Sequence, residues 1–87
     1  MIIMSLDDRS DRINRGSSRS VPTQVAADIE ADIDAGKLVP DTRLPSEAEL
    51  AEQYGVARIS VRRAIAQLRE RGKVITFQGR GTYVTPR

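Results

Sequence analysis

The side chains best suited to chemistry in this sequence are arginines, and most of them lie in its last third. Residues 58–87 hold eight basic residues and one acidic residue, a balance of +7, whereas residues 20–57 hold two basic and eight acidic residues, a balance of −6. A guanidinium is planar, stays charged and presents a fork of donors that fits phosphates and base edges. This segregation favours one surface that binds a polyanion. A solvated surface on which charges happen to cluster is the alternative.

The residues that most enzymes and metal sites use are missing. The 87-residue chain has no cysteine and no histidine, which removes disulfides, thiolate zinc ligands and the commonest general base. No nucleophile–base pair or ligand cluster is visible, so we predict no enzyme activity, no metal site and no cofactor. The apolar start, Met1–Met4, is too short for a signal peptide, and no run approaches a membrane span. We therefore expect one small cytoplasmic domain that does not contact a membrane.

Most of these arginines belong to residues 58–71, which have the periodicity of a helix. Its apolar residues recur at the spacing of one buried stripe, formed by Val61, Ala64, Ile65 and Leu68. The opposite face carries Ile59, Arg62, Arg63 and Ala66, with Arg58 and Arg69 at its edge. Because arginines concentrate in the N-terminal half and Ala66 is small, this face is typical of a helix that enters a major groove. Arginines that only solubilise a surface are the alternative.

A short helix before this one is marked by its two ends. Ser46 and Glu49 match a capping box, in which each side chain bonds the backbone amide of the other residue. Its apolar face is formed by Leu50, Ala51 and Tyr54. Gly55 is predicted to end it in a left-handed conformation. Two helices joined by so short a turn cross steeply, as in a helix-turn-helix.

Residues 74–85 have the pattern of a β-hairpin. Val74–Phe77 and Thr82–Thr85 are rich in β-branched and aromatic residues and predict two strands. The turn between them is formed by Gln78, Gly79, Arg80 and Gly81. The glycines let the backbone approach a phosphate, or place Arg80 in a narrow groove. A dinucleotide-binding fingerprint is excluded because no helix follows.

The first half of the chain divides into two parts. Residues 1–20 are polar and irregular, so we expect a disordered N-terminal arm. Residues 21–87 are expected to form one α+β, mainly helical domain. It begins with an amphipathic helix from about Pro22 to Gly36. An extended connector with at most one short strand follows over residues 37–44.

The combined pattern resembles the winged helix-turn-helix domain of the GntR family of bacterial transcription regulators, over roughly residues 21–85. The matching pieces are Leu44-Pro45-Ser46-Glu47, Glu49-Leu50-Ala51, Gly55-Val56, Arg58, Val61-Arg62, Ala64, Leu68, Gly72 and Gln78-Gly79-Arg80-Gly81-Thr82-Tyr83-Val84. The resemblance implies three helices plus a β-hairpin wing. It also implies sequence-specific binding of double-stranded DNA by a regulator, with repression as the expected outcome, in the bacterial cytoplasm at the nucleoid.

The resemblance also assigns roles to residues. Helix 58–71 is expected in the major groove, with Arg58 and Arg62 on bases or phosphates, and the wing at residues 78–82 in the minor groove. The full expected DNA-binding set is Ser46, Arg58, Ile59, Ser60, Arg62, Arg63, Gln78, Gly79, Arg80 and Gly81. Three positions depart from the family pattern. Ala48 replaces an arginine that contacts DNA, Ala57 replaces a capping serine, and Arg63 replaces an acidic residue.

Similar regulators carry a C-terminal domain that binds a metabolite and dimerises, whereas this sequence stops just past the wing. We expect a truncated piece of such a regulator rather than a protein that lacks the effector domain. The operator is expected to be an inverted repeat, bound by a homodimer that forms on DNA or through the effector domain. Two other functions stay open: a winged helix that contacts protein, which predicts an exposed apolar patch, and an RNA binder, which predicts exposed aromatics.

Overall fold

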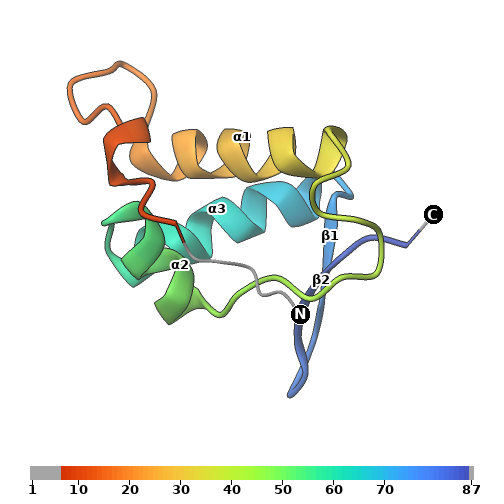
Figure 1. The fold of residues 1–87 in the computed structure, drawn as a ribbon. Helices are drawn as coiled ribbons and strands as arrows, with labels where there is room; N and C mark the ends of the chain where they lie inside the picture. The colour runs from red at the N-terminus through yellow and green to blue at the C-terminus, as the bar shows by residue number, and fades with distance from the viewer. Residues whose placement is uncertain (1–6, 87) are drawn as a thin grey trace.

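A computed structural model describes residues 7–86 as three helices followed by a hairpin (Figure 1). The elements are η1 (Ser10–Arg12), α1 (Val21–Asp34), α2 (Glu47–Tyr54), α3 (Arg58–Glu70), β1 (Val74–Phe77) and β2 (Gly81–Val84). The predicted α+β fold of three helices and a β-hairpin wing is therefore confirmed. Within the described residues, no helix is both long and apolar enough to cross a membrane.

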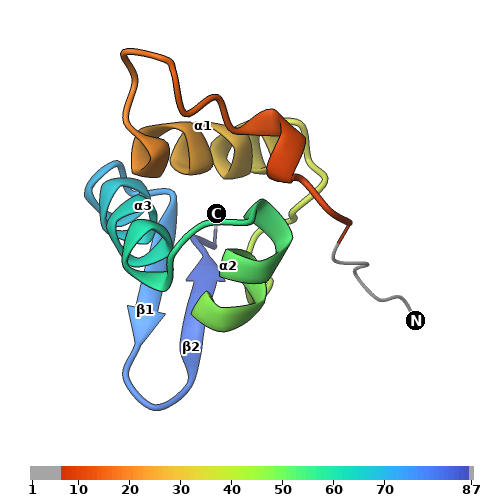
Figure 2. The same cartoon turned by 90° about the vertical axis from the view of Figure 1, so that its left-hand side faces the viewer.

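The core forms where α1 lies across α3, with the hairpin closing one end (Figure 2). Val25 of α1 and Val61 and Leu68 of α3 have no exposed surface. Val74 and Val84, which pair across the hairpin, extend this core to the sheet. The apolar stripe predicted on α3 is the buried face, so its arginine-bearing face points to solvent.

Both predicted ends of α2 are present. The Ser46 hydroxyl accepts from the amide of Glu49 at 3.1 Å, and the amide of Ser46 donates to the Glu49 carboxylate at 2.9 Å. Gly55 ends the helix with a φ of 64°, a left-handed conformation that glycine adopts without steric cost. The chain then turns directly into α3, which makes the helix-turn-helix.

The connector between α1 and α2 runs beside β2 and behaves as a third short strand. The amide of Leu44 donates to the carbonyl of Thr82, and the amide of Val84 donates to the carbonyl of Thr42, both at 2.8 Å. Between these bonds Arg43 pairs with Tyr83 in an antiparallel bridge. The second strand begins one residue earlier than predicted, at Gly81, because that residue still pairs with Phe77.

For residues 7–20 the structure corrects the expectation of a disordered arm, because these residues pack against the helices. Residues 1–6, the rest of that expected arm, lie outside the described residues. The amide of Arg9 donates to the carbonyl of Gln53 at 2.7 Å, and its guanidinium bonds Asp28 at 2.7 Å and Asp32 at 2.8 Å. Through Arg9 this segment therefore links the two acidic side chains of α1 to the backbone of α2.

Candidate nucleic-acid interface

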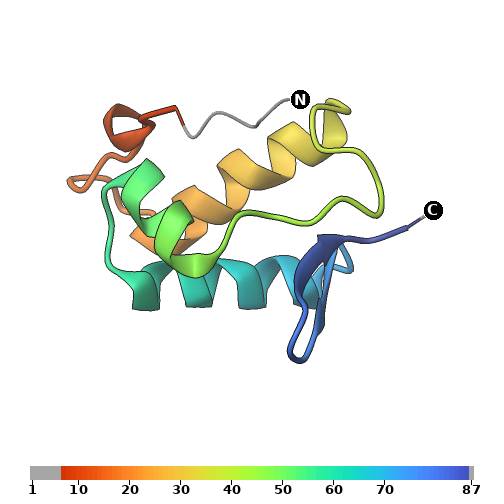
Figure 3. The ribbon, with the colours of Figure 1, turned by 60° about the horizontal axis from the view of Figure 1, so that its bottom comes forward.

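The exposed face of α3 and the wing lie on one side of the molecule. In Figure 3 the hairpin projects past α3 in the direction that this helix faces. Arg58, Arg62 and Arg63 are exposed, and Ile59 keeps 46% of its surface accessible. Ser60 is half-buried in the same turn. The predicted residues of α3 thus share its N-terminal half, which is the half that reads bases in helix-turn-helix proteins.

The N-terminus of α3 lacks a side-chain cap. Ala57 has the extended backbone of an N-cap residue, with φ −68° and ψ 149°, but its methyl group bonds no amide. The positive end of the helix dipole and the unbonded amides therefore remain available at the arginine-rich end of the helix.

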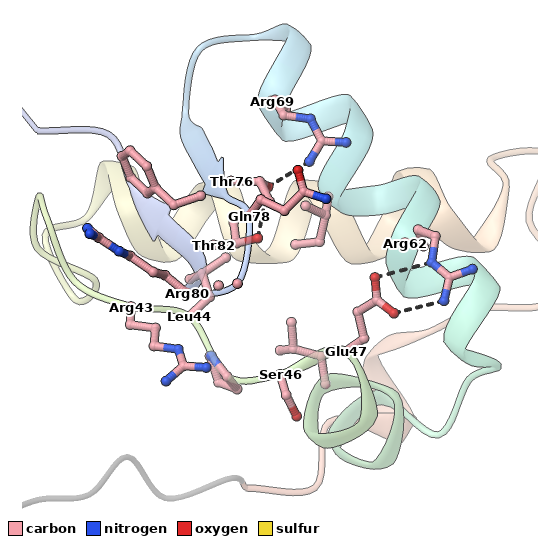
Figure 4. A pocket seen from close by; sticks show the side chains of 16 residues that line it. Arg43, Leu44, Ser46, Glu47, Arg62, Arg69, Thr76, Gln78, Arg80 and Thr82 are labelled. Carbon is pink, nitrogen blue, oxygen red and sulfur yellow. Dashed lines mark hydrogen bonds and ion pairs between the residues drawn. The ribbon is translucent and has the colours of Figure 1, made fainter.

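Arg62 is held by a carboxylate from the neighbouring helix. Its Nη2 donates to Oε1 of Glu47 at 3.0 Å and its Nε donates to Oε2 at 3.2 Å (Figure 4). These hydrogen bonds from Arg62 lower the pKa of Glu47, and the guanidinium charge adds to the effect. Glu47 therefore stays ionised, and one edge of the Arg62 guanidinium is fixed while the other remains free.

A groove of about 720 Å³ separates the helix-turn-helix from the wing. Four arginines line it: Arg43 from the connector, Arg62 and Arg69 from α3, and Arg80 from the hairpin turn. Figure 4 shows Glu47 and Ser46 on the α2 side and Gln78 and Thr82 on the hairpin side. The Ser46 hydroxyl accepts the capping bond from Glu49, so its own hydrogen can still be donated. The groove thus offers cationic and hydroxyl donors along its length.

The wing is braced against α3 by a chain of hydroxyl contacts. Arg69 donates to Thr76 at 2.7 Å, and Thr76 and Thr82 lie 2.9 Å apart across the hairpin. Phe77 and Tyr83 pack edge to face with their ring centres 5.7 Å apart. At the tip, Gly79 and Gly81 take positive φ values, and Arg80 between them is exposed. The hairpin is thereby held in place while its arginine stays free.

Ion pairing differs sharply between the two sides of the domain. On the α1 side, Arg71 pairs with Glu30 at 2.6 Å and Lys73 pairs with Asp34 at 2.9 Å. Around the groove and on α3, four arginines have no side-chain hydrogen bond or ion pair within residues 7–86: Arg43, Arg58, Arg63 and Arg80. The unpaired arginines therefore lie in two places, Arg43 and Arg80 in the groove lining and Arg58 and Arg63 on the exposed face of α3.

Three features of this surface were missed in the sequence. Arg43 joins the groove because the connector pairs with β2, and Glu47 reaches Arg62 because two helices cross. Arg69 contacts the wing through Thr76. The pairing of Thr76 with Thr82 across the hairpin is a sequence signal for this contact, because it places two hydroxyl groups side by side. Among the described residues, no group of three or more acidic, histidine or cysteine side chains could hold a metal ion.

Known proteins resemble this chain over most of its length. Residues 22–84 match the family model described as "Bacterial regulatory proteins, gntR family". The chain is 40% identical over 73 residues to the HTH-type transcriptional repressor NagR of Bacillus subtilis, covering 84% of this chain and 30% of the relative. It is 39% identical over 70 residues to the histidine utilization repressor of Klebsiella aerogenes, covering 76% and 29%. The chain thus spans about a third of the length of the curated relatives it matches.

Solved structures agree with the fold. The AraR DNA-binding domain in complex with operator ORX1 superposes with a TM-score of 0.71 at 41% identity, over 74% of this chain and 77% of that one. YtrA from Sulfolobus acidocaldarius, a GntR-family transcription factor, superposes with a TM-score of 0.79 at 32% identity, over 86% and 79%.

Proposed function

The chain belongs to the gntR family of bacterial regulatory proteins, with the family's helix-turn-helix DNA-binding domain at residues 22–84, and on this premise we propose that it binds operator DNA as part of a repressor. The observation that carries the proposal is the exposed N-terminal half of α3 beside a braced wing: Arg58 and Arg63 have no ion pair within residues 7–86, and Arg62 is held in place by Glu47. The guanidinium groups of Arg58 and Arg63 therefore have no paired carboxylate to displace when they meet DNA.

The proposed arrangement puts α3 in the major groove. Arg58 and Arg62 lie one turn apart at the start of the helix, and a guanidinium there can bond O6 and N7 of a guanine together. Arg63 adds charge on the same face, and Ile59 and Ser60 lie within the same turn. Arg63 also offsets the absence of an arginine at Ala48.

The wing supplies the second contact in this proposal. Its tip, Gln78 to Gly81, enters the adjacent minor groove with Arg80 foremost, because narrow minor grooves have a negative potential that attracts arginine. The remaining groove-lining residues face the sugar–phosphate backbone between the two grooves. Ser46 contributes there through its hydroxyl hydrogen.

We also propose that two copies act together on an inverted repeat. A two-fold arrangement of two domains matches a palindromic operator, with half-sites on one face of the duplex. The sequence leaves no heptad and no second apolar helix face once the core stripes are assigned, so the 87-residue chain is expected to dimerise only on DNA. Sedimentation that shows a tight dimer without DNA would contradict this part.

One titration tests the function against its alternatives. Equimolar mixed-sequence duplex DNA, single-stranded DNA and RNA are compared by fluorescence anisotropy at several salt concentrations. The proposal expects a clear preference for duplex DNA, and a duplex pool of random sequence should yield an enriched operator on repeated selection. Equal binding to all three nucleic acids, or tighter binding to RNA, would overturn it.

A further inference from the structure

Arg43 occupies a place that the helix-turn-helix pattern does not assign. It lies in the connector, ahead of α2, yet its backbone is fixed on both sides by the bonds that join Thr42 and Leu44 to β2. Arg43 itself pairs with Tyr83. An arginine in an unpaired loop would lose much conformational freedom on binding. Here the backbone is already ordered by the wing, so that cost falls on the side chain alone.

The side chain of Arg43 lies directly against the base of the wing tip. A Cβ added to Gly81 would come within 2.7 Å of the Arg43 Nε and within 3.3 Å of Cζ and Nη2. A side chain at position 81 would therefore push the guanidinium away, besides being strained by the φ of 123°. Glycine at this position thus leaves room for a guanidinium across the hairpin.

The guanidinium is exposed to the groove and carries an uncompensated charge. Arg43 is exposed, lines the groove together with Arg80, and makes no side-chain hydrogen bond or ion pair with any residue from 7 to 86. Figure 4 shows Arg43 and Arg80 on the same side of the groove, opposite Arg62. An unpaired guanidinium on a fixed backbone beside a wing is suited to bind a phosphate.

We propose that Arg43 binds a single phosphate of the DNA backbone where the strand passes between the helix-turn-helix and the wing. The inference rests on the proposed function, since it needs duplex DNA on this surface. Its ligand is a phosphodiester and not a base, so its contribution is independent of sequence.

The first test measures affinity against salt for three variants on one mixed-sequence duplex. Arg43→Gln should weaken binding about three- to tenfold near 0.1 M salt and flatten the slope of log K against log salt by about 0.9, the value of one phosphate. Arg43→Lys keeps the charge and should keep the wild-type slope. Lys37→Gln is the matched control, because Lys37 is exposed and lies outside the groove lining, and it should change the slope little.

A second test identifies the ligand. Single phosphates of the selected operator are replaced in turn by uncharged methylphosphonate. The proposal expects one position at which the substitution weakens the wild type but has no further effect on Arg43→Gln.

The outcomes separate the two proposals. If wild type shows no duplex preference, the proposed function fails. If wild type binds duplex normally while Arg43→Gln keeps the wild-type slope, or loses affinity with no coupled phosphate, the assignment of Arg43 fails alone. Melting by circular dichroism confirms that each variant is folded.

Discussion

Glu47 in the first turn of α2 accepts two hydrogen bonds from Arg62 of α3, of 3.0 and 3.2 Å, across the turn of the helix-turn-helix. The two bonds occupy one edge of the guanidinium and leave its remaining donors directed elsewhere. The pair therefore fixes the plane of the Arg62 guanidinium, which we propose contacts a base. On that proposal the negative charge of Glu47 opposes the approach of DNA, so the pair is expected to favour correct placement of Arg62 over affinity.

Glu47→Ala should separate these two effects. Loss of the carboxylate removes a repulsive charge, so affinity for a scrambled duplex should rise. Loss of the carboxylate also removes the two hydrogen bonds that orient Arg62. The ratio of operator affinity to scrambled-duplex affinity should therefore fall by about five- to tenfold, which corresponds to part of one good base contact. Anisotropy titrations on both duplexes measure the ratio.

Glu52→Ala is the matched control for that variant. Glu52 is an exposed carboxylate of the same helix with no ion pair among residues 7–86. It should raise scrambled-duplex affinity slightly and leave the ratio near the wild-type value. Equal ratios for Glu47→Ala and wild type would mean that the pair does not orient Arg62.

Binding to any duplex should depend steeply on salt. If four to six phosphates are engaged per domain, the slope of log K against log salt should be about −4 to −5, because each neutralised phosphate releases about 0.9 counterions. Isothermal titrations between roughly 0.05 and 0.2 M salt give this slope. A flat dependence would show that the unpaired arginines do not meet phosphates.

Ala57→Ser should stabilise the domain. The extended backbone at Ala57 already suits an N-cap, and a serine hydroxyl there can accept from an amide in the first turn of α3. The expected gain is about 1 kcal/mol in the free energy of unfolding, or a rise of about 4–8 °C in melting temperature. Urea titration and thermal melting measure it. Ala48→Ser, where Ser46 already caps α2, should change stability by less than about 0.5 kcal/mol.

Acid should weaken the attachment of the N-terminal segment through Asp28. Burial raises the pKa of this carboxyl, but hydrogen bonds from Tyr54, Arg12 and Arg9 outweigh it and hold the pKa below the ordinary value of 3.8. Because the folded state prefers the ionised form, this contribution is complete above the unfolded pKa and disappears as the pH falls through the folded pKa. Asp28→Asn should therefore be less stable than wild type near neutral pH.

The comparison of these two proteins by urea unfolding at about pH 7 and about pH 3 tests the account. The difference in unfolding free energy should shrink at the lower pH. A difference that stays constant between the two pH values would show that ionisation of Asp28 contributes nothing to stability.

Local signals in the sequence were enough to predict the elements and the exposed face of α3. The capping box of Ser46 and Glu49, the stop at Gly55 and the stripe on α3 are each determined within a few residues, so they could be predicted. The exposed arginines of α3 then followed, because burying one face of a helix exposes the opposite one.

What escaped prediction depends on pairing between distant residues. Arg9 bonds carboxylates 19 and 23 residues away, so its polar neighbours suggested an unstructured arm. Arg62 meets Glu47 across 15 residues only because two helices cross at a particular angle. Arg43 reaches the groove only because the connector adds to the sheet. Composition and periodicity carry no information on such contacts.

The proposal that α3 reads the operator while Arg80 of the wing enters the minor groove is tested most directly by comparing Arg62→Ala with Arg80→Ala on the selected operator and on its single-base variants. Arg62→Ala should cost about 1–3 kcal/mol on the operator and relax base preference at one position. Arg80→Ala should weaken all duplexes evenly and flatten the salt slope by about one. If Arg62→Ala, folded as judged by circular dichroism, keeps wild-type affinity and base preference, α3 does not read the sequence and the account is contradicted.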